Sequence, residues 1–188
     1  MRVLMLVATP VATDTRVLRE ATTLAGAGHT VHVVGRAVPE GFVPPGGVTV
    51  SSVGISSALR RTGTAPIPTR RRPPPVRLAR WLLLPEHRRS AFGRWAAAAV
   101  DDAATRDFDV VHAHDFTALA AGSTLADGRR VPLVYDTHEL WTGRPREHRP
   151  TPLQDRRERR LERRLGDRAD AVLTVGDGVA AALRGRYG

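Results

Sequence analysis

Short apolar runs alternate with longer segments of helical periodicity along most of this 188-residue chain. The runs predict strands at residues 2–8, 30–35, 48–53, 132–136 and 171–175, and a further strand that starts at Asp109. The intervening segments predict a helix with Thr13 or Asp14 as its N-cap and Gly28 as its stop, helices at 86–105, 118–126 and 153–165, and a last helix capped by Asp177. Repeated strand–helix units favour a doubly wound, mostly parallel sheet, so we expect a Rossmann-like α/β fold.

The chain is expected to form one domain over residues 1–188, with a basic Pro/Arg-rich loop at about 54–85. Cysteine is absent, which excludes a disulfide framework and a thiolate metal site. The apolar run at the N-terminus is only about seven residues long, so it is predicted as a strand and not as a signal peptide. No window reaches the roughly 18 to 20 apolar residues that a membrane span needs. These features predict a cytoplasmic protein.

The formal net charge is +10, and all 29 basic residues are arginine. A surface this basic attracts phosphates, anionic lipids or nucleic acid. In the predicted helix at 153–165, the arginines alternate with Glu158 and Glu162 and are expected to face solvent. Leu161 and Leu165 of this helix are expected to face the core.

The segment from Arg70 to Trp95 interleaves arginines with Trp81 and with the leucines at 82–84. This pattern predicts contact with an anionic membrane surface, at the inner face of the membrane, or with an acidic acceptor. The alternative is a basic loop followed by an ordinary amphipathic helix, whose tryptophan and leucines pack into the core of the domain.

Polar side chains follow two of the predicted strands at the point where each strand ends. The segment DVVHAHD at 109–115 supplies His112, His114 and Asp115, and PLVYDTHE at 132–139 supplies Asp136, His138 and Glu139. Ligands of open parallel sheets bind at the carboxyl edge of the strands. The sequence therefore predicts a polar site at this edge of the sheet.

Four segments, in order, resemble the N-terminal half of family 4 glycosyltransferases: residues 14–34, 109–122, 134–141 and 168–183. Enzymes of this family have the GT-B fold, in which two Rossmann-like domains face each other across a cleft, and they transfer sugars from nucleotide-sugars with retention of configuration. The resemblance therefore implies a hexosyltransferase-like enzyme with a nucleotide-sugar as co-substrate, no resident cofactor and no metal. Its partners would be that donor and a glycan, lipid-linked or small-molecule acceptor, and not nucleic acid.

In the family, the second domain holds the nucleotide-sugar and carries a pair of glutamates spaced eight residues apart. This chain ends at Tyr187-Gly188, about where the connection to that domain would begin, so we expect an acceptor-side half that is inactive alone. Many relatives also carry a Gly-Gly loop after the first strand, whereas residues 8–16 read ATPVATDTR. Phosphate contacts made by glycine backbone in those relatives cannot be transferred here, although Arg16 and the helix N-terminus near Asp14 could still meet an anion.

The resemblance assigns His138 to the family histidine that lines the cleft beside the donor sugar, which makes it the predicted catalytic residue. The alternative is a capping or loop role for this side chain. His114 and Asp115 are expected to face the acceptor. His112 shares a strand face with His114, but it is predicted as a buried, hydrogen-bonded core residue.

The remaining acceptor-binding candidates flank the ends of the same strands. Asp136 and Glu139 are expected to bind acceptor hydroxyls, or otherwise to cap the helix that follows. Asp14 and Arg16 are expected to line the cleft, with an ion pair at the helix N-terminus as the alternative.

Other classes of function compete with this interpretation. A metal-dependent hydrolase could use His112, His114, Asp115 and His138, since an HxHD segment at a strand end suits a first-row metal. A dinucleotide-dependent oxidoreductase requires a G-x-G-x-x-G segment after the first strand, but residues 8–16 contain no glycine. A basic nucleic-acid-binding domain would explain the charge and not the motifs at the strand ends.

Overall fold

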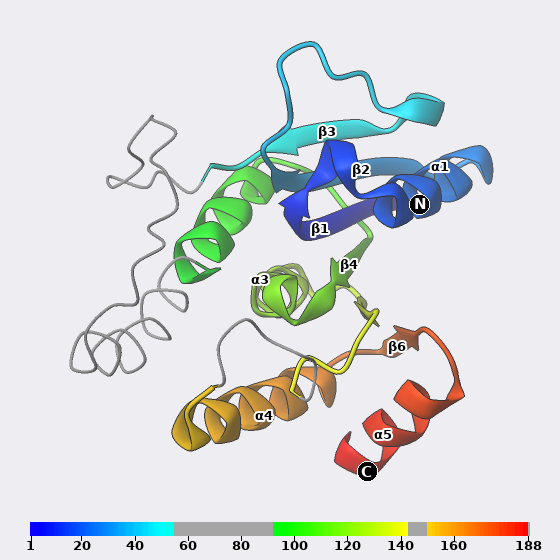
Figure 1. Ribbon diagram of the computed structural model, residues 1–188. Coiled ribbons are helices and arrows are strands. Elements are labelled where there is room, and N and C mark those ends of the chain that lie inside the picture. The colour runs from blue at the N-terminus through cyan, green and yellow to red at the C-terminus, as the bar shows by residue number, and fades with distance from the viewer. Residues whose placement is uncertain (55–91, 143–149, 188) are drawn as a thin grey trace, which may run out of the picture.

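Six parallel strands form one sheet in the part of the chain that the computed structural model describes, which is residues 1–54, 92–142 and 150–187. The strand order is β3-β2-β1-β4-β5-β6, and each neighbouring pair is parallel (Figure 1). The strands are β1 (Arg2–Pro10), β2 (Thr30–Arg36), β3 (Thr49–Ser52), β4 (Val110–His114), β5 (Leu133–Thr137) and β6 (Ala171–Thr174). The predicted doubly wound parallel sheet is confirmed.

Helices cover both faces of this sheet. They are α1 (Thr15–Gly26), a helix at 92–104, α3 (Asp115–Arg129), α4 (Pro152–Gly166) and α5 (Asp177–Tyr187). The helix at 92–104, α3 and α4 pack on one face, and α1 packs on the other (Figure 1). The chain reverses its winding direction between β1 and β4, which lie side by side, and this is the point at which ligands bind in folds of this kind.

Side chains of β1 point alternately to the two faces of the sheet, and this divides the hydrophobic core in two. Leu4 and Leu6 contribute to the core beneath α3, whereas Met5 and Val7 contribute to the core beneath α1. All four side chains are at most 1% exposed. Successive residues of a strand point to opposite faces, so a strand buried on both faces reads as a continuous apolar run.

Local signals define the ends of α1. The Asp14 carboxylate accepts a hydrogen bond from the backbone N–H of Val17 at 3.4 Å, which caps the first turn. At the other end, Gly28 adopts a φ of +84°, and the His29 N–H donates to the Leu24 carbonyl. Glycine tolerates this left-handed conformation without a steric penalty, so the predicted start and stop of this helix are confirmed.

The helix α3 is longer than the predicted helix at 118–126. It begins at Asp115, directly after the last residue of β4, because Asp115 adopts a φ of +60° and turns the chain within one residue. It continues to Arg129 and ends where Arg130 takes the left-handed conformation. Aspartate tolerates this region of φ better than most residues, since its short polar side chain bonds locally.

The predicted orientation of α4 is wrong in one respect. Glu162, expected on the solvated face, is 1% exposed, whereas Leu161 and Leu165 are only partly buried. The Glu162 carboxylate accepts a hydrogen bond from the Tyr135 hydroxyl at 3.2 Å and one from Arg186 at 3.4 Å. A buried carboxylate is tolerated when such donors replace its water, so α4 turns this side chain toward the sheet.

Most of the expected Pro/Arg-rich loop at 54–85 and of the Arg70 to Trp95 segment lies outside the described residues. Trp95 is described, and it is fully buried against the α3 side of the sheet. The expectation that Trp95 belongs to a membrane-contacting surface is therefore wrong. Within the described ranges, none of the helices combines the length and apolar character required to cross a bilayer.

Replacement of Gly122 by alanine is expected to destabilise the fold by about 1–3 kcal/mol, the usual cost of overpacking. A Cβ at this position of α3 would lie 2.8 Å from the Ala113 Cβ and 3.1 Å from a Leu133 methyl group. The free energy of unfolding in urea measures the effect. Gly128→Ala in the same helix is the matched control, because no atom of the described residues lies within 4 Å of its added Cβ. Equal stability of both variants would contradict the close approach of α3 to β4.

Candidate functional site

Three buried polar side chains point from the carboxyl half of the sheet toward the α1 face. Val111 and Ala113 of β4 pack in the core beneath α3, so His112 and His114 point the opposite way. On β5, Asp136 follows the core residue Tyr135 and takes the same side as the histidines. His114 pairs in register with Asp136, which brings the two strands' polar residues together.

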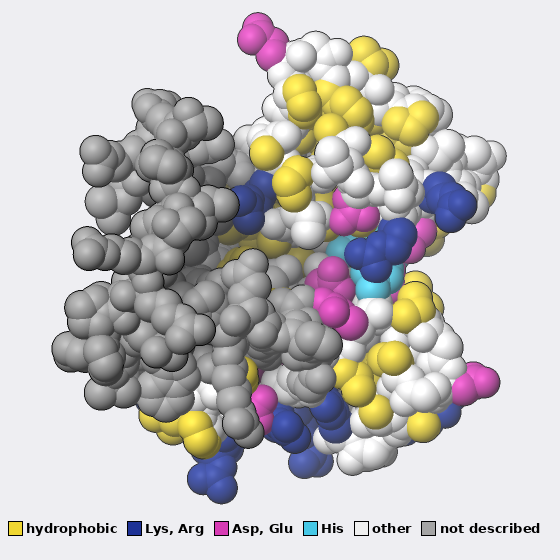
Figure 2. Space-filling model, viewed as in Figure 1, with side chains coloured by type: hydrophobic (Ala, Val, Ile, Leu, Met, Phe, Trp, Pro, Cys, Tyr) yellow, Lys and Arg dark blue, Asp and Glu magenta, His cyan; other side chains and the backbone are white. Residues whose placement is uncertain are grey.

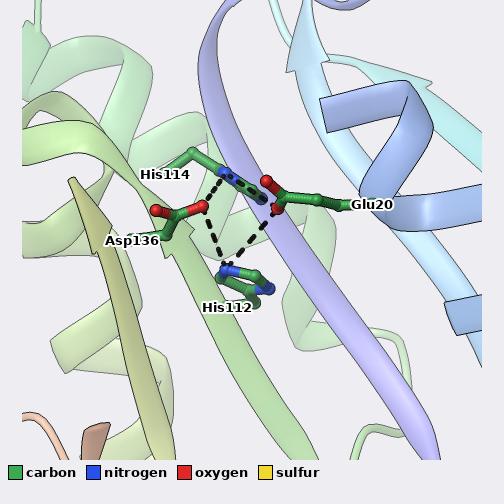
Figure 3. Close-up of side chains that lie close together, drawn as sticks. All are labelled: Glu20, His112, His114 and Asp136. Atoms are coloured by element: carbon green, nitrogen blue, oxygen red, sulfur yellow. Dashed lines mark ion pairs between the residues drawn. The ribbon is translucent and has the colours of Figure 1, made fainter. Parts of the chain in front are cut away.

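A fourth side chain, Glu20, reaches these residues from α1 (Figure 3). Its Oε2 lies 4.0 Å from His112 Nε2 and 3.8 Å from His114 Nδ1. The Asp136 Oδ2 lies 3.6 Å and 3.4 Å from the same two nitrogens. We call Glu20, His112, His114 and Asp136 the His–acid cluster. Its four donor atoms lie within 4.8 Å of one another.

His138 stands beside this cluster, directly after β5. Its Nε2 lies 3.6 Å from Asp136 Oδ2, and its ring is stacked on that of His114 with 6.0 Å between centroids. Its backbone N–H donates to the Asp115 carboxylate at 3.3 Å. Asp115 thus ties the end of β5 to the start of α3, and the structure brings His114, Asp115 and His138 together at the predicted edge of the sheet.

Burial governs the electrostatics of the site. Burial, with a contribution from the charge of Asp136, raises the pKa of Glu20 to about 7. Burial also lowers the pKa of His114 to about 4. Burial alone would raise the pKa of Asp136, but its interactions with His112 and His114 outweigh that effect and hold it below the usual range. Asp136 is therefore ionised at neutral pH and His114 is neutral.

Several polar atoms here have no hydrogen-bond partner within the described chain. They are Glu20 Oε2, His112 Nε2, and both ring nitrogens of His114 and of His138. A buried polar group left unpaired costs about 1–3 kcal/mol, so such a concentration indicates a site for a polar ligand. His112 is buried as predicted, but the expectation that it is hydrogen-bonded is wrong for Nε2.

The other predicted site residues lie at the start of α1 and just after β5. The Asp14 carboxylate caps α1 and also accepts a hydrogen bond from the Thr9 hydroxyl at 2.7 Å. Arg16 is half exposed and lies 3.9 Å from Asp14, and its charge acts on the Asp115 and Glu20 carboxyls. Glu139 is exposed, and its charge also acts on Asp115. Figure 2 shows histidine, acidic and basic side chains gathered in a notch of the molecular surface.

The model of the family described as "Glycosyl transferase 4-like domain" matches residues 12–188. The chain belongs to this glycosyltransferase family. Comparison with curated protein sequences gave no significant match.

Solved structures of similar fold are also glycosyltransferases of the GT-B type. Sucrose-phosphate synthase from Thermosynechococcus elongatus matches with a TM-score of 0.65 and 14% identity, over 98% of this chain and 45% of the synthase. SsfS6 of Streptomyces sp. SF2575, solved with thymidine diphosphate, matches at 0.53 and 16%, over 94% of this chain and 49% of SsfS6. Anabaena HepE, solved with UDP, matches at 0.52 and 16%, over 92% of this chain and 37% of HepE.

The glycosyltransferase domain thus spans less than half the length of these three proteins. At such identities the likeness shows the fold alone, and it agrees with the predicted N-terminal half of a GT-B fold. The rival metal-hydrolase hypothesis required Asp115 and His138 beside His112 and His114. In the structure, the four-donor group contains Glu20 and Asp136 in their place.

Glu20 is not among the site residues that the sequence predicts. It lies three residues after Val17 and one before Ala21, both buried in α1, so it borders the apolar face of the helix. An acidic residue at that border, above a strand that carries HAH, was the available signal. A charged side chain at the edge of a helix face is usually solvated, and only the packing of α1 on the face of the sheet that carries the histidines distinguishes this one.

Glu20→Gln is expected to flatten the pH dependence of stability in the metal-free domain. The pKa of Glu20 is raised in the folded state. Its favourable contribution to the free energy of unfolding is therefore present below about pH 4.5 and is lost as pH rises through about 7. Glutamine has no such loss, so the variant gains stability relative to wild type between pH 5 and pH 8. Urea unfolding in a chelating buffer measures this difference, with Glu40→Gln as the exposed control. Parallel pH profiles of wild type and Glu20→Gln would contradict it.

Proposed function

We propose that this domain is the acceptor-binding half of a retaining glycosyltransferase, which transfers a sugar from a nucleotide-sugar to a glycan, lipid-linked or small-molecule acceptor. One observation carries the proposal: in a domain of this family, His138, Asp115 and the His–acid cluster meet at the carboxyl edge, beside the start of α1. This is where folds with this strand order bind ligands.

The donor in this proposal is a nucleoside diphosphate sugar held mainly by a second domain that faces this edge. Support comes from SsfS6 and HepE, which were solved with thymidine diphosphate and with UDP. Asp14 already caps the N-terminus of α1, so the half-exposed guanidinium of Arg16 is the group best placed to meet a phosphate.

Transfer with retention requires little covalent chemistry from the protein. The acceptor hydroxyl attacks the anomeric carbon on the face from which the diphosphate departs, so placement of the two substrates and stabilisation of developing charge dominate. In our proposal His138 supplies a polar contact beside the reacting sugar. Its backbone hydrogen bond to Asp115 and its proximity to Asp136 hold the ring, and neither ring nitrogen has a hydrogen-bond partner among the described residues.

The proposed acceptor residues differ in their access to solvent. Arg16 and Glu139 are exposed and Asp115 is partly buried, which suits direct contact with acceptor hydroxyls. His114 and Asp136 are 1% and 4% exposed, and in this proposal they act mainly by orienting His138. Asp14 acts through the position of α1.

The isolated 188-residue chain is expected to bind nucleotide-sugars weakly or not at all and to transfer no sugar, because in this proposal a second domain holds the donor. Calorimetric titration with UDP and with thymidine diphosphate, together with a donor-consumption assay over a panel of nucleotide-sugars, measures both. Turnover of any nucleotide-sugar by the pure chain would contradict this proposal.

His138→Ala, placed in a protein that joins this chain to its donor domain, is expected to lower kcat by on the order of 100-fold. That is the scale of losing one positioned polar group in a transition state. His29→Ala is the matched control, since His29 precedes β2 and lies at the opposite edge of the sheet. Circular dichroism verifies that both variants fold. Unchanged kcat in the folded His138 variant would reduce this residue to a capping role.

A further inference from the structure

We infer that the His–acid cluster is a binding site for one first-row divalent cation, with Zn²⁺ as the best match. This inference goes beyond the proposed function, since the proposed transfer of sugar needs no metal. It concerns Glu20, His112, His114 and Asp136 as a set of ligands contributed by α1, β4 and β5.

The donor atoms suit zinc in type and in number. Zinc in proteins takes imidazole nitrogens and carboxylate oxygens at about 2.0–2.2 Å, in a tetrahedron whose ligand atoms are therefore roughly 3.3–3.6 Å apart. The four nitrogen–oxygen pairs among the donor atoms are separated by 3.4, 3.6, 3.8 and 4.0 Å. All the donor atoms lie within 4.8 Å of one another, so a contraction of roughly half an ångström per ligand would close a tetrahedron around an ion.

The unpaired atoms of these side chains point to the same occupant. Glu20 Oε2, His112 Nε2 and His114 Nδ1 are inaccessible to solvent and face one another, and none has a hydrogen-bond partner in the part of the chain that the structure describes (Figure 3). The side chains of His112 and His114 are 8% and 0% exposed. One cation would satisfy all three atoms and Asp136 Oδ2 at once, and its two positive charges would balance the two carboxylates.

The location of the ligands defines the role of the ion. Four protein ligands leave no open position on a tetrahedral metal, which is typical of structural sites. The ion would join α1 to β4 and β5, three segments that are distant in sequence. Partners that touch a ligand help to orient it, so the 3.6 Å contact between Asp136 and His138 would connect the metal to the position of the His138 ring.

Metal titration of the folded chain tests the inference. The chain is stripped with a chelator, dialysed and titrated with Zn²⁺, and with Co²⁺ as a spectroscopic probe of geometry. We expect one ion per chain, the visible absorption of tetrahedral Co²⁺, and a rise in Tm on the order of 5 °C at a hundredfold excess over Kd. Absence of stoichiometric binding, or an octahedral Co²⁺ spectrum, would overturn the inference.

Variants then locate the ion. Glu20→Gln changes the most exposed of the four ligands, at 37%, while keeping its shape, so it is the variant that best preserves the fold. It is expected to weaken Zn²⁺ binding at least 10-fold, since even groups adjacent to ligands contribute that much. Glu40→Gln, outside the cluster, should bind as wild type does. Equal affinity of Glu20→Gln and wild type would place the ion elsewhere and overturn the inference. None of these measurements depends on sugar transfer, so the zinc inference can fail while the proposed function holds, and the reverse.

Discussion

The pairing of β4 between β1 and β5 is the interaction on which the site depends. Val111 and Ala113 are fully buried beneath α3, and this apolar packing fixes which face of the strand they occupy. Because side chains alternate, the same packing forces His112 and His114 to the opposite face, above which α1 lies. A slip of one residue would exchange the two sets, burying imidazoles in an apolar core and exposing valine to the polar site. The hydrophobic core thus positions the polar chemistry.

Burial of these polar groups costs free energy, and the shifted pKa values of the site limit how many of them are charged. Two buried histidines and a buried aspartate would be expensive if every group were charged, but the shifted pKa values leave Asp136 ionised and His114 neutral. Glu20 remains partly exposed, so its titration near neutral pH is less costly than that of a fully buried carboxyl. Sites that concentrate such departures from ordinary packing are typical of functional regions.

The sequence predicted the parallel sheet, its approximate strands and the gathering of polar residues at one edge, because each follows from periodicity along a single segment. It failed where a contact joins distant segments. Glu20 meets the histidines only through the packing of α1 across the sheet, and Glu162 is buried only because Tyr135 and Arg186 supply donors from β5 and α5. The early start of α3 depends on one left-handed backbone conformation at Asp115, which periodicity does not reveal.

The two sides of the polar site differ in how firmly they are held. On one side, α3 starts directly after β4, without a connecting loop. Its backbone lies so close to β4 at Gly122 that an added Cβ would clash with Ala113, so β4 is closely packed from behind. On the other side, α1 is joined to β1 through residues 11–14 and reaches the cluster through one long side chain at 3.8–4.0 Å. The β4 side of the site is therefore closely packed, whereas the α1 side meets the cluster through a single side chain. Glu20 has three rotatable side-chain bonds and each histidine has two, so in the proposed zinc site the adjustment to the ion would fall mainly on Glu20.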